Sequence, residues 1–200
     1  MKINKLLIAT HNPGKFKEIS RHLSVLQIKL LSLADLGIKD DFEETGKTYQ
    51  ENSLGKAKFY HQLSGLPSLA DDSGLSVEAL NGEPGINSRT WPGYRASDEE
   101  LLKMLLAKME KVPPDKRQAS FVTVVAFVDK DKEIVSQGEI KGTIAQELIC
   151  PIEEGFPYSS VFYPQGYKQV FSQLTTDEKN AISHRGLALE EFIKQIKILC

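Results

Sequence analysis

The sequence predicts an α/β fold built on a mixed β-sheet. A short apolar strand near the N-terminus leads directly into an amphipathic helix, as in sheets whose parallel strands are joined through helices. Two apolar segments in the second half are separated only by a charged turn, which predicts antiparallel neighbours in the same sheet. No repeat, low-complexity tract or sharp change of composition divides residues 1–200. We therefore expect a single domain.

The first predicted strand, residues 5–10, ends in the loop His11-Asn12-Pro13-Gly14-Lys15, and a helix with one apolar face follows. A loop that opens a helix presents backbone N–H groups and the positive end of the helix dipole. Lys15 adds a full positive charge, so the loop is a candidate anion site. The alternative is a plain connection, because the spacing is not that of the phosphate-binding P-loop.

The next segments combine a strand, an acidic loop and a long helix. A strand is predicted at residues 28–31, and the loop after it carries a run of acids at residues 40–44 that is typical of a solvated surface. Thr48 and Glu51 have the spacing of a capping box, which predicts a helix to about residue 64. Asn52 and Lys56 lie near its apolar stripe, where they either snorkel to solvent or reach into a cleft.

Residues 69–75 read Leu-Ala-Asp71-Asp72-Ser73-Gly74-Leu, with apolar runs on both sides. The pattern predicts two strands joined by a tight corner, with the acids at its apex. Because side chains alternate along a strand, Asp71 and Asp72 should point in opposite directions. Carboxylates at a strand end suit Mg²⁺, which takes only one or two protein carboxylates. The alternative is a polar turn whose aspartates cap their own backbone.

The second half predicts a helix, two strands and a closing helix. Ser97 and Glu100 cap a helix whose leucines and Met109 read as core. Residues 119–128 are apolar on both faces, as in a central strand, and residues 133–140 alternate like its half-exposed partner. Aromatic residues near 155–163 precede a Lys and a His-Arg pair. Together these residues could form a wall that stacks on a base and neutralises phosphates. The alternative is that the aromatic residues are core and that the His-Arg pair is exposed in the first turn of the last helix.

Composition excludes several classes of function. The net charge of -2 provides no basic surface for nucleic acid, and no apolar run approaches the roughly 18 residues of a membrane span. The four apolar residues 6–9 are too few for a secretory signal. Cys150 and Cys200 have no disulfide or metal-ligand spacing, and Cys200 is not part of a prenylation box. We expect a soluble cytoplasmic protein that binds neither nucleic acid nor membrane.

Six segments together resemble the inosine triphosphatase family, the pyrophosphatases of noncanonical purine nucleoside triphosphates. They are Ala9-Thr10-His11-Asn12-Pro13-Gly14-Lys15, Glu43-Glu44-Thr45-Gly46, Glu51-Asn52 with Lys56-Ala57, Ala70-Asp71-Asp72-Ser73-Gly74-Leu75, Leu80-Asn81-Gly82 with Pro84-Gly85, and residues 178–185 (Glu-Lys-Asn-Ala-Ile-Ser-His-Arg). Each segment is a modest signal, but all six in this order are specific to the fold and to a nucleoside triphosphate site.

The resemblance implies a two-lobed ITPase-like fold with a long mixed central sheet flanked by helices, a central nucleotide cleft, and a homodimer. It implies Mg²⁺-dependent hydrolysis of ITP, dITP and XTP to the nucleoside monophosphate and pyrophosphate. The residues implied to hold the phosphates are Thr10, His11, Asn12, Pro13, Gly14, Lys15, Lys56 and Ser73.

The same resemblance assigns the metal and the base. Glu44 and Asp72 would hold Mg²⁺, with Asp71 or Glu43 assisting, and Asp72 would orient or deprotonate the attacking water. The residues implied to close over the base and the phosphates are Lys179, His184 and Arg185, with Phe156 stacking on the purine in a loop that includes Pro157, Tyr158 and Ser159. Lysines, an arginine and one metal ion suffice to neutralise most of a triphosphate's roughly four negative charges. Whether Asp71 or Asp72 is the base stays open.

The sequence departs from the family pattern at the predicted base-facing loop. Members usually have Gly-Phe-Gly-aromatic-Asp-Pro, where this chain has Gly155-Phe156-Pro157-Tyr158-Ser159-Ser160. Proline removes an N–H and fixes φ, and serine removes a carboxylate. Arg89 is also one position earlier than usual. Two alternatives to the first reading follow: the same hydrolase with altered base selectivity, or a nucleotide-binding protein with little turnover.

Overall fold

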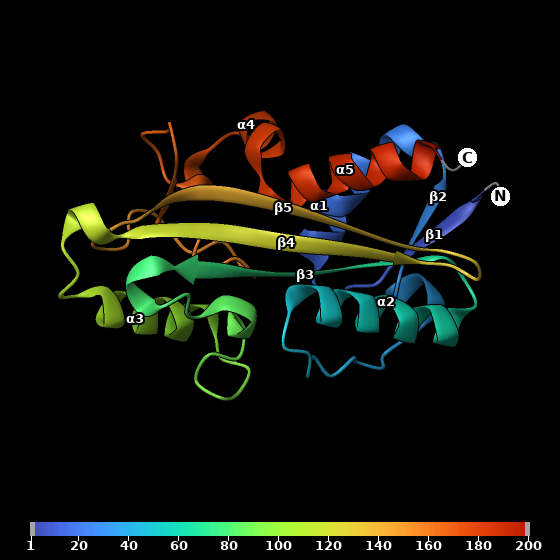
Figure 1. Ribbon diagram of the computed structural model, residues 1–200, viewed down its shortest axis with the longest axis horizontal. Helices are drawn as coiled ribbons and strands as arrows, with labels where there is room; N and C mark the ends of the chain where they lie inside the picture. The colour runs from blue at the N-terminus through green and yellow to red at the C-terminus, as the bar shows by residue number, and fades with distance from the viewer. Residues whose placement is uncertain (1–2, 199–200) are drawn as a thin grey trace. The chain divides into compact units, whose positions relative to one another are not determined.

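The computed structural model describes residues 3–198 and confirms an α/β fold (Figure 1). The described residues form a six-stranded sheet in the order β2-β1-β3-β4-β5-β6. It is mixed, because β1 pairs in parallel with β2 and β3, whereas β5 and β6 are antiparallel. The strands are β1 (Lys5–Ile8), β2 (Lys29–Ser32), β3 (Ser68–Val77), β4 (Gln118–Val128), β5 (Glu133–Ile144) and β6 (Phe162–Pro164). The α-helices are α1 (Pro13–Leu23), α2 (Tyr49–Ser64), α3 (Asp98–Met109), α4 (Thr176–Ile182) and α5 (His184–Ile198).

The chain folds as two compact units, and β3, β4 and β5 each contribute residues to both. Within the described residues, the first unit comprises residues 3–72, 123–138 and 185–198, and the second comprises residues 73–122 and 139–184. Cys200 lies outside the described residues, and Cys150 is half-buried without a disulfide partner among them. No helix in the described part of the chain is long and apolar enough to cross a membrane.

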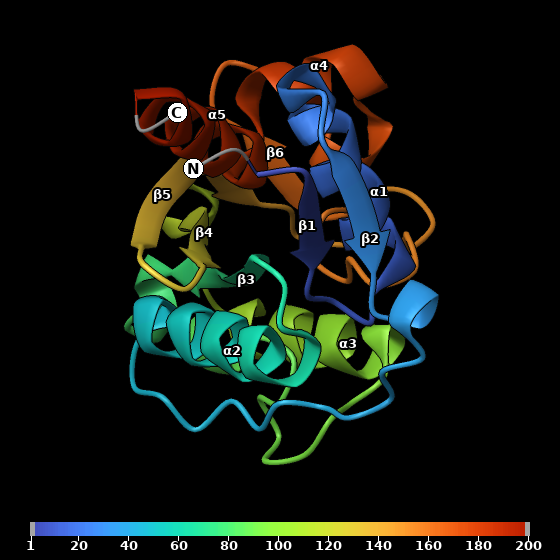
Figure 2. The ribbon, with the colours of Figure 1, turned by 90° about the vertical axis from the view of Figure 1, so that its right-hand side faces the viewer.

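In the first unit, helices cover both faces of the strands. Alternate residues of β1 point to opposite faces: Leu6 and Ile8 pack with α1 and α5, whereas Leu7 packs with α2. Figures 1 and 2 show α1 and α5 on one side of β1 and β3, and α2 on the other. By the same alternation, neighbouring side chains of β3 face different helices.

The predicted helix starts are largely confirmed. Thr48 caps α2 by accepting from the N–H of Glu51 at 3.0 Å, but the Glu51 carboxylate accepts from the N–H of Lys47, so the capping box is only half formed. Ser97 caps α3 by accepting from the N–H of Glu100 at 3.2 Å.

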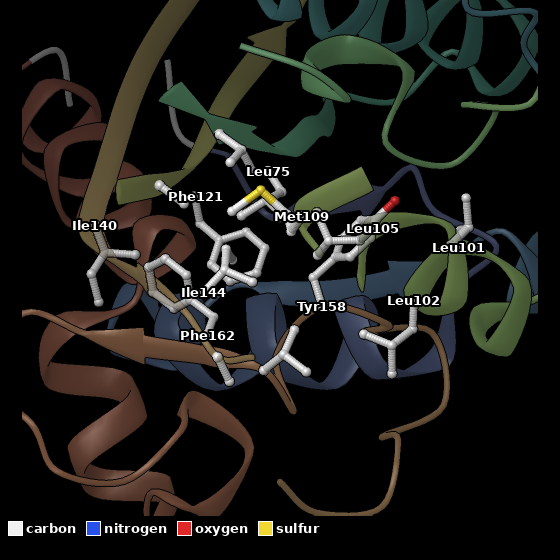
Figure 3. Close-up of a cluster of buried hydrophobic side chains, with 14 of the residues drawn as sticks. Leu75, Leu101, Leu102, Leu105, Met109, Phe121, Ile140, Ile144, Tyr158 and Phe162 are labelled. Carbon is white, nitrogen blue, oxygen red and sulfur yellow. The ribbon is translucent and has the colours of Figure 1, made fainter. Parts of the chain in front are cut away.

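The second unit has one apolar core between its strands and α3. Leu101, Leu105 and Met109 of α3 belong to the same buried cluster as Leu75 and Phe121, which confirms that this helix face is core. Figure 3 shows Met109 beside Leu75 and Phe121. The alternating burial of β5 confirms a half-exposed strand next to the buried β4.

The predicted corner at residues 69–75 is wrong. β3 continues without a break from Ser68 to Val77 and includes both aspartates and Gly74. The polar-turn alternative is wrong for the same reason. A carboxylate inside a buried strand requires a partner, and the neighbouring helices supply one for each aspartate.

Candidate active site

Adjacent residues of β3 place two carboxylates on opposite faces of the first unit. Asp71 Oδ2 lies 3.1 Å from Lys15 Nζ of α1 and 3.1 Å from Arg185 Nε of α5. Asp72 Oδ2 instead accepts a hydrogen bond of 3.0 Å from Asn52 Nδ2 of α2. The prediction that the two side chains point in opposite directions is therefore confirmed. Both are buried, with 1% and 5% of their surface exposed.

Asp71 belongs to a buried network of four charged groups. Arg185 donates to Asp71 and also to Glu18 Oε2 at 2.5 Å, while the half-buried Lys15 contacts Asp71 from α1. Burial favours the neutral acid, but the charges of Lys15 and Arg185 outweigh burial and lower the pKa of Asp71. Burial lowers the pKa of Lys15, and Asp71 opposes that effect. Asp71 is thus held as an ionised counter-charge.

The structure changes the expectations for the His-Arg pair. Arg185 is 2% exposed and His184 is 8% exposed, so the reading of both as exposed first-turn residues is wrong. The Arg185 guanidinium donates to Asp71 and Glu18, which both belong to the first unit. The role implied by the resemblance, closing over base and phosphates, stays a prediction. What Arg185 does in the described structure is to hold two carboxylates.

Asp72 has the opposite electrostatic environment. Burial and the neighbouring charge of Glu44 together raise its pKa from 3.8 to about 6, although the Asn52 hydrogen bond opposes them. Burial and the charge of Asp72 also raise the pKa of Tyr49. The Tyr49 hydroxyl has no hydrogen-bond partner among residues 3–198. A carboxylate with a pKa near neutrality is suited to accept a proton.

Lys56 and Glu44 form an ion pair next to the two aspartates. Lys56 Nζ contacts Glu44 Oε1 and donates to the backbone oxygen of Asp71 at 3.3 Å. Burial disfavours the charged amine, but Glu44 and Asp71 outweigh burial and raise the pKa of Lys56. These contacts argue against the alternative in which Lys56 snorkels to solvent, while the alternative in which it reaches into a cleft stays a prediction.

The loop before α1 has fewer available N–H groups than the sequence suggests. Asn12 is the N-cap of α1, and its Oδ1 accepts from the N–H groups of Gly14 at 2.8 Å and Lys15 at 3.1 Å. The N–H of Asn12 in turn donates to Thr10 Oγ1. These N–H groups become available to an anion only if the Asn12 side chain moves. The Lys15 amine, with its side chain 20% exposed, is the loop's remaining positive group.

The other residues predicted to hold the phosphates include His11 and Pro13 at this loop and Ser73 in β3. His11 is exposed, and its Nε2 lies 3.0 Å from the backbone oxygen of Asp40 and 3.3 Å from the Tyr60 hydroxyl. Pro13 occupies the first turn of α1, where its missing N–H costs nothing. Ser73 follows Asp72 in β3 and is half-buried.

In the second unit, the loop at residues 155–159 is fixed by its own contacts. Tyr158 is buried in the core, and its hydroxyl donates to the backbone oxygen of Ser88 at 2.8 Å. The Ser159 hydroxyl donates to the Phe156 carbonyl at 2.7 Å and accepts from Ser172. Pro157 is buried, whereas Phe156 is half-buried. The Ser159 hydroxyl therefore stabilises the loop, at a position where the family pattern has a carboxylate.

Two more predicted residues, Lys179 and His184, gather around aromatic rings of the second unit. Lys179 of α4 lies 3.1 Å from Glu153 and 5.9 Å from the centre of the Phe171 ring. His184 stacks on Phe121, with ring centres 5.0 Å apart and planes inclined by 17°. Of the aromatic residues near 155–163, Tyr158 and Phe162 are core residues, as one sequence alternative proposed.

Sequence reasoning assigned no role to Glu18, Gly46 or Tyr49, and it left the direction of Asn52 open. Asn52 lay in a matching segment, and a buried amide on an apolar stripe is the signal that could have identified it. Glu18 lies one helical turn from Lys15, and only the packing of α5 reveals its contact with Arg185. Gly46 lay at the end of a matching segment, whereas Tyr49 carries no signal of its own in the sequence.

Comparison with known proteins gives concordant results. The profile described as the Ham1 family matches residues 6–195. The dITP/XTP pyrophosphatase of Thermoanaerobacter pseudethanolicus is 44% identical over 185 residues, covering 92% of each chain. That of Clostridium perfringens is 41% identical over 202 residues, covering 98% of each.

Solved structures agree with the sequence relatives. A HAM1 protein from Coxiella burnetii has a TM-score of 0.85 and 35% identity, covering 98% of this chain and 99% of that one. The structure described as nucleoside-triphosphatase / dITP/XTP pyrophosphatase from Mycobacterium abscessus has a TM-score of 0.73 and 39% identity, covering 94% and 98%. The resemblance seen in the sequence is thus confirmed, and this chain belongs to the Ham1 family.

Proposed function

We propose that this protein is a nucleoside triphosphate pyrophosphatase that hydrolyses dITP, ITP and XTP to the nucleoside monophosphate and pyrophosphate with Mg²⁺. Its relatives named dITP/XTP pyrophosphatases support the reaction class. The observation that carries the proposal is the opposite electrostatic state of two adjacent carboxylates in β3. One is a fixed counter-charge beside two cations, and the other is a base with a pKa of about 6.

Asp72 is the base in this proposal. Water attacks the α-phosphorus, the bond from that phosphorus to the bridging oxygen breaks, and pyrophosphate leaves with the electron pair. The attacking water loses a proton to Asp72, the carboxylate whose pKa is raised to about 6 by burial and by Glu44 before any cation binds. Asp71 is a poor base because Lys15 and Arg185 favour its charged form. Our proposal therefore assigns the role of base to Asp72 and not to Asp71.

The lysines of the first unit supply positive charge for the phosphates. Lys15 and Lys56 lie on α1 and α2 with amines beside Asp71, and both side chains are only partly exposed, at 20% and 15%. Charge-assisted hydrogen bonds from such amines are about twice as strong as neutral ones. Reactions of this kind depend mainly on positioning and charge neutralisation, which explains why the proposal needs no covalent nucleophile.

The donor set fits Mg²⁺ when a nucleotide shares its coordination. No group of three or more His, Cys, Asp or Glu residues is arranged for a metal within residues 3–198. Mg²⁺ nevertheless takes only one or two protein carboxylates together with water and phosphate oxygens. Glu44 and Asp72 provide two such groups, and their mutual repulsion raises the pKa of Asp72. The ion would supply charge neutralisation at the phosphates. To bind it, Glu44 would have to give up its ion pair with Lys56.

Base selectivity depends on the loop at residues 155–159. Phe156 is half-buried and provides a ring for stacking on the base. Ser159 has no carboxylate to offer a base edge, and its hydroxyl is bonded to Phe156 and Ser172. The altered loop makes the same hydrolase with altered base choice the second candidate. The presence of both Glu44 and Asp72 argues against a protein that binds nucleotide without turnover.

A panel assay tests both candidates. Pyrophosphate release is measured with ITP, XTP, dITP, ATP and GTP, each in MgCl₂ and in EDTA. We expect release from the first three in MgCl₂ only, and comparable turnover of GTP would establish the broader candidate. No release from any nucleotide by folded protein would refute the proposed function.

Matched substitutions then locate the site. Asp72→Asn should lower kcat by about three orders of magnitude because it removes the base and one proposed metal oxygen. Glu44→Gln should raise the Mg²⁺ concentration needed for half-maximal rate. Glu43 is at most an assisting group in this proposal, so Glu43→Gln should change that concentration much less. Equal effects of the two glutamine substitutions would contradict the metal assignment.

We further propose a cytoplasmic homodimer, since the family resemblance implies that assembly and the composition suggests that compartment. Sedimentation equilibrium tests the assembly: a mass near 22.3 kDa at all concentrations would indicate a monomer and contradict the proposal.

A further inference from the structure

A single buried amide on α2 connects the two parts of the first unit that carry the proposed metal and base residues. Asn52 lies in the first turns of α2 and is 3% exposed. Its Nδ2 donates to Asp72 Oδ2 at 3.0 Å, and its Oδ1 accepts from the N–H of Gly46 at 2.8 Å. Gly46 follows Glu44 by two residues. The amide therefore contacts both the strand that carries Asp72 and the loop that carries Glu44.

The hydrogen bond from Gly46 determines the orientation of the amide. A backbone N–H can only donate, so the Asn52 atom facing Gly46 must be the oxygen. The NH₂ group then has to face Asp72, where it meets the acceptor that an ionised carboxylate provides. Neither aspartate nor leucine at position 52 makes both contacts, because aspartate lacks the donor and leucine lacks donor and acceptor.

Gly46 is required for space rather than for backbone conformation. A Cβ added there would lie 2.5 Å from Asn52 Oδ1 and 2.8 Å from the Cβ of Glu51. Since its φ is not in the left-handed region, another residue is excluded by the close approach of the loop to α2. The absence of a side chain thus allows the hydrogen bond of 2.8 Å to form.

We propose that Asn52 is the positioning residue of the active site, setting the separation of Glu44 and Asp72 by binding the Gly46 backbone and the Asp72 carboxylate with the two ends of one amide. This inference rests on the proposed function and adds a residue that acts through Asp72 and through the Glu44 loop without touching substrate. Preorganisation of this kind affects the transition state more than substrate binding.

The test compares Asn52→Leu with Ser53→Ala. Leucine conserves most of the volume and removes both hydrogen bonds. Ser53 is also buried on the same helix, and within residues 3–198 its hydroxyl bonds only to the Gln50 carbonyl of its own turn. With dITP and saturating MgCl₂, we expect Asn52→Leu to lower kcat at least tenfold while KM changes less than threefold. Ser53→Ala should stay within threefold of the wild type in both constants.

A binding measurement provides a readout that does not depend on turnover. The melting temperature is measured with a non-hydrolysable α,β-imido analogue of dITP, once in MgCl₂ and once in EDTA. We expect the Mg²⁺-dependent increase of the wild type to fall by at least half in Asn52→Leu and to persist in Ser53→Ala. A merely structural role would lower both melting temperatures and leave their difference unchanged.

A second variant keeps Asn52 in place and displaces its amide. Gly46→Ala should lower kcat at least tenfold and reduce the same Mg²⁺-dependent increase, so it decides the matter if Asn52→Leu fails to fold. Wild-type kcat in a folded Asn52→Leu, or an unchanged increase in both variants, would overturn the inference. A wild type without turnover would instead refute the proposed function, and the melting-temperature comparison would still test the positioning role.

Discussion

Replacing Asp72 by asparagine should make the protein more stable while it removes the proposed base. Asp72 is 5% exposed, and burial together with the charge of Glu44 raises its pKa from 3.8 to about 6. The folded state therefore binds the proton more tightly than the unfolded state does. Ionised Asp72 destabilises the fold, and this penalty develops as the pH rises from about 4 to about 6.

The magnitude follows from the difference of about two pKa units. Each unit corresponds to 1.36 kcal/mol, so the ionised carboxylate costs about 3 kcal/mol of unfolding free energy at pH 8. The same linkage relation gives about half that value at pH 5 and almost none below pH 4. An asparagine at this position has a side-chain oxygen that can still accept from Asn52 Nδ2.

Asp71→Asn is the matched control with the opposite expected sign. Lys15 and Arg185 lower the pKa of Asp71, so its ionised form stabilises the fold above the ordinary pKa and that contribution is lost as the pH falls below it. Chemical denaturation at pH 5, 6.5 and 8, in EDTA and without nucleotide, measures both variants. Destabilisation by Asp72→Asn at pH 8, or a gain that does not shrink at pH 5, would refute the electrostatic reasoning.

Three further substitutions test other parts of the structure. Arg185→Met should lower the unfolding free energy by about 3–5 kcal/mol in urea denaturation, because Asp71 and Glu18 both lose their contact with the buried guanidinium; a loss below about 1 kcal/mol would contradict this. Gly142→Ala should lower the melting temperature in a thermal scan, since its Cβ would collide with the backbone oxygen of Tyr163; an unchanged value would be inconsistent with the β5–β6 register. Tyr49→Phe should raise the unfolding free energy by up to about 1 kcal/mol, because the hydroxyl is buried without a partner among residues 3–198; destabilisation would reveal a hydrogen bond to it.

Much of the fold could be predicted from local patterns. The cap residues Thr48 and Ser97 mark the starts of α2 and α3 because a side-chain oxygen satisfies N–H groups that every helix start leaves open. The two-sided apolarity of β4 and the alternation of β5 indicate how many faces of each strand are covered. These signals depend on neighbours in sequence, so the sequence contains them in full.

The errors arose where distant residues supply the partner. Asp71, Asp72 and Gly74 resemble a turn because buried acids and glycine are unfavourable in an isolated strand. β3 nevertheless continues through them, since α1 and α5 bring Lys15 and Arg185 to one face and α2 brings Asn52 to the other. No local pattern reports a partner that lies 114 residues away in the chain.

The amino-acid sequence determined the family, the order of the elements and the chemical types at the site, because motif spacing and hydrophobic period are properties of the chain itself. The tertiary structure decided which of the two carboxylates is neutralised and which is left basic. That difference depends on burial and on the distances to Lys15, Arg185 and Glu44, and such quantities exist only after the helices have packed on the two faces of β3.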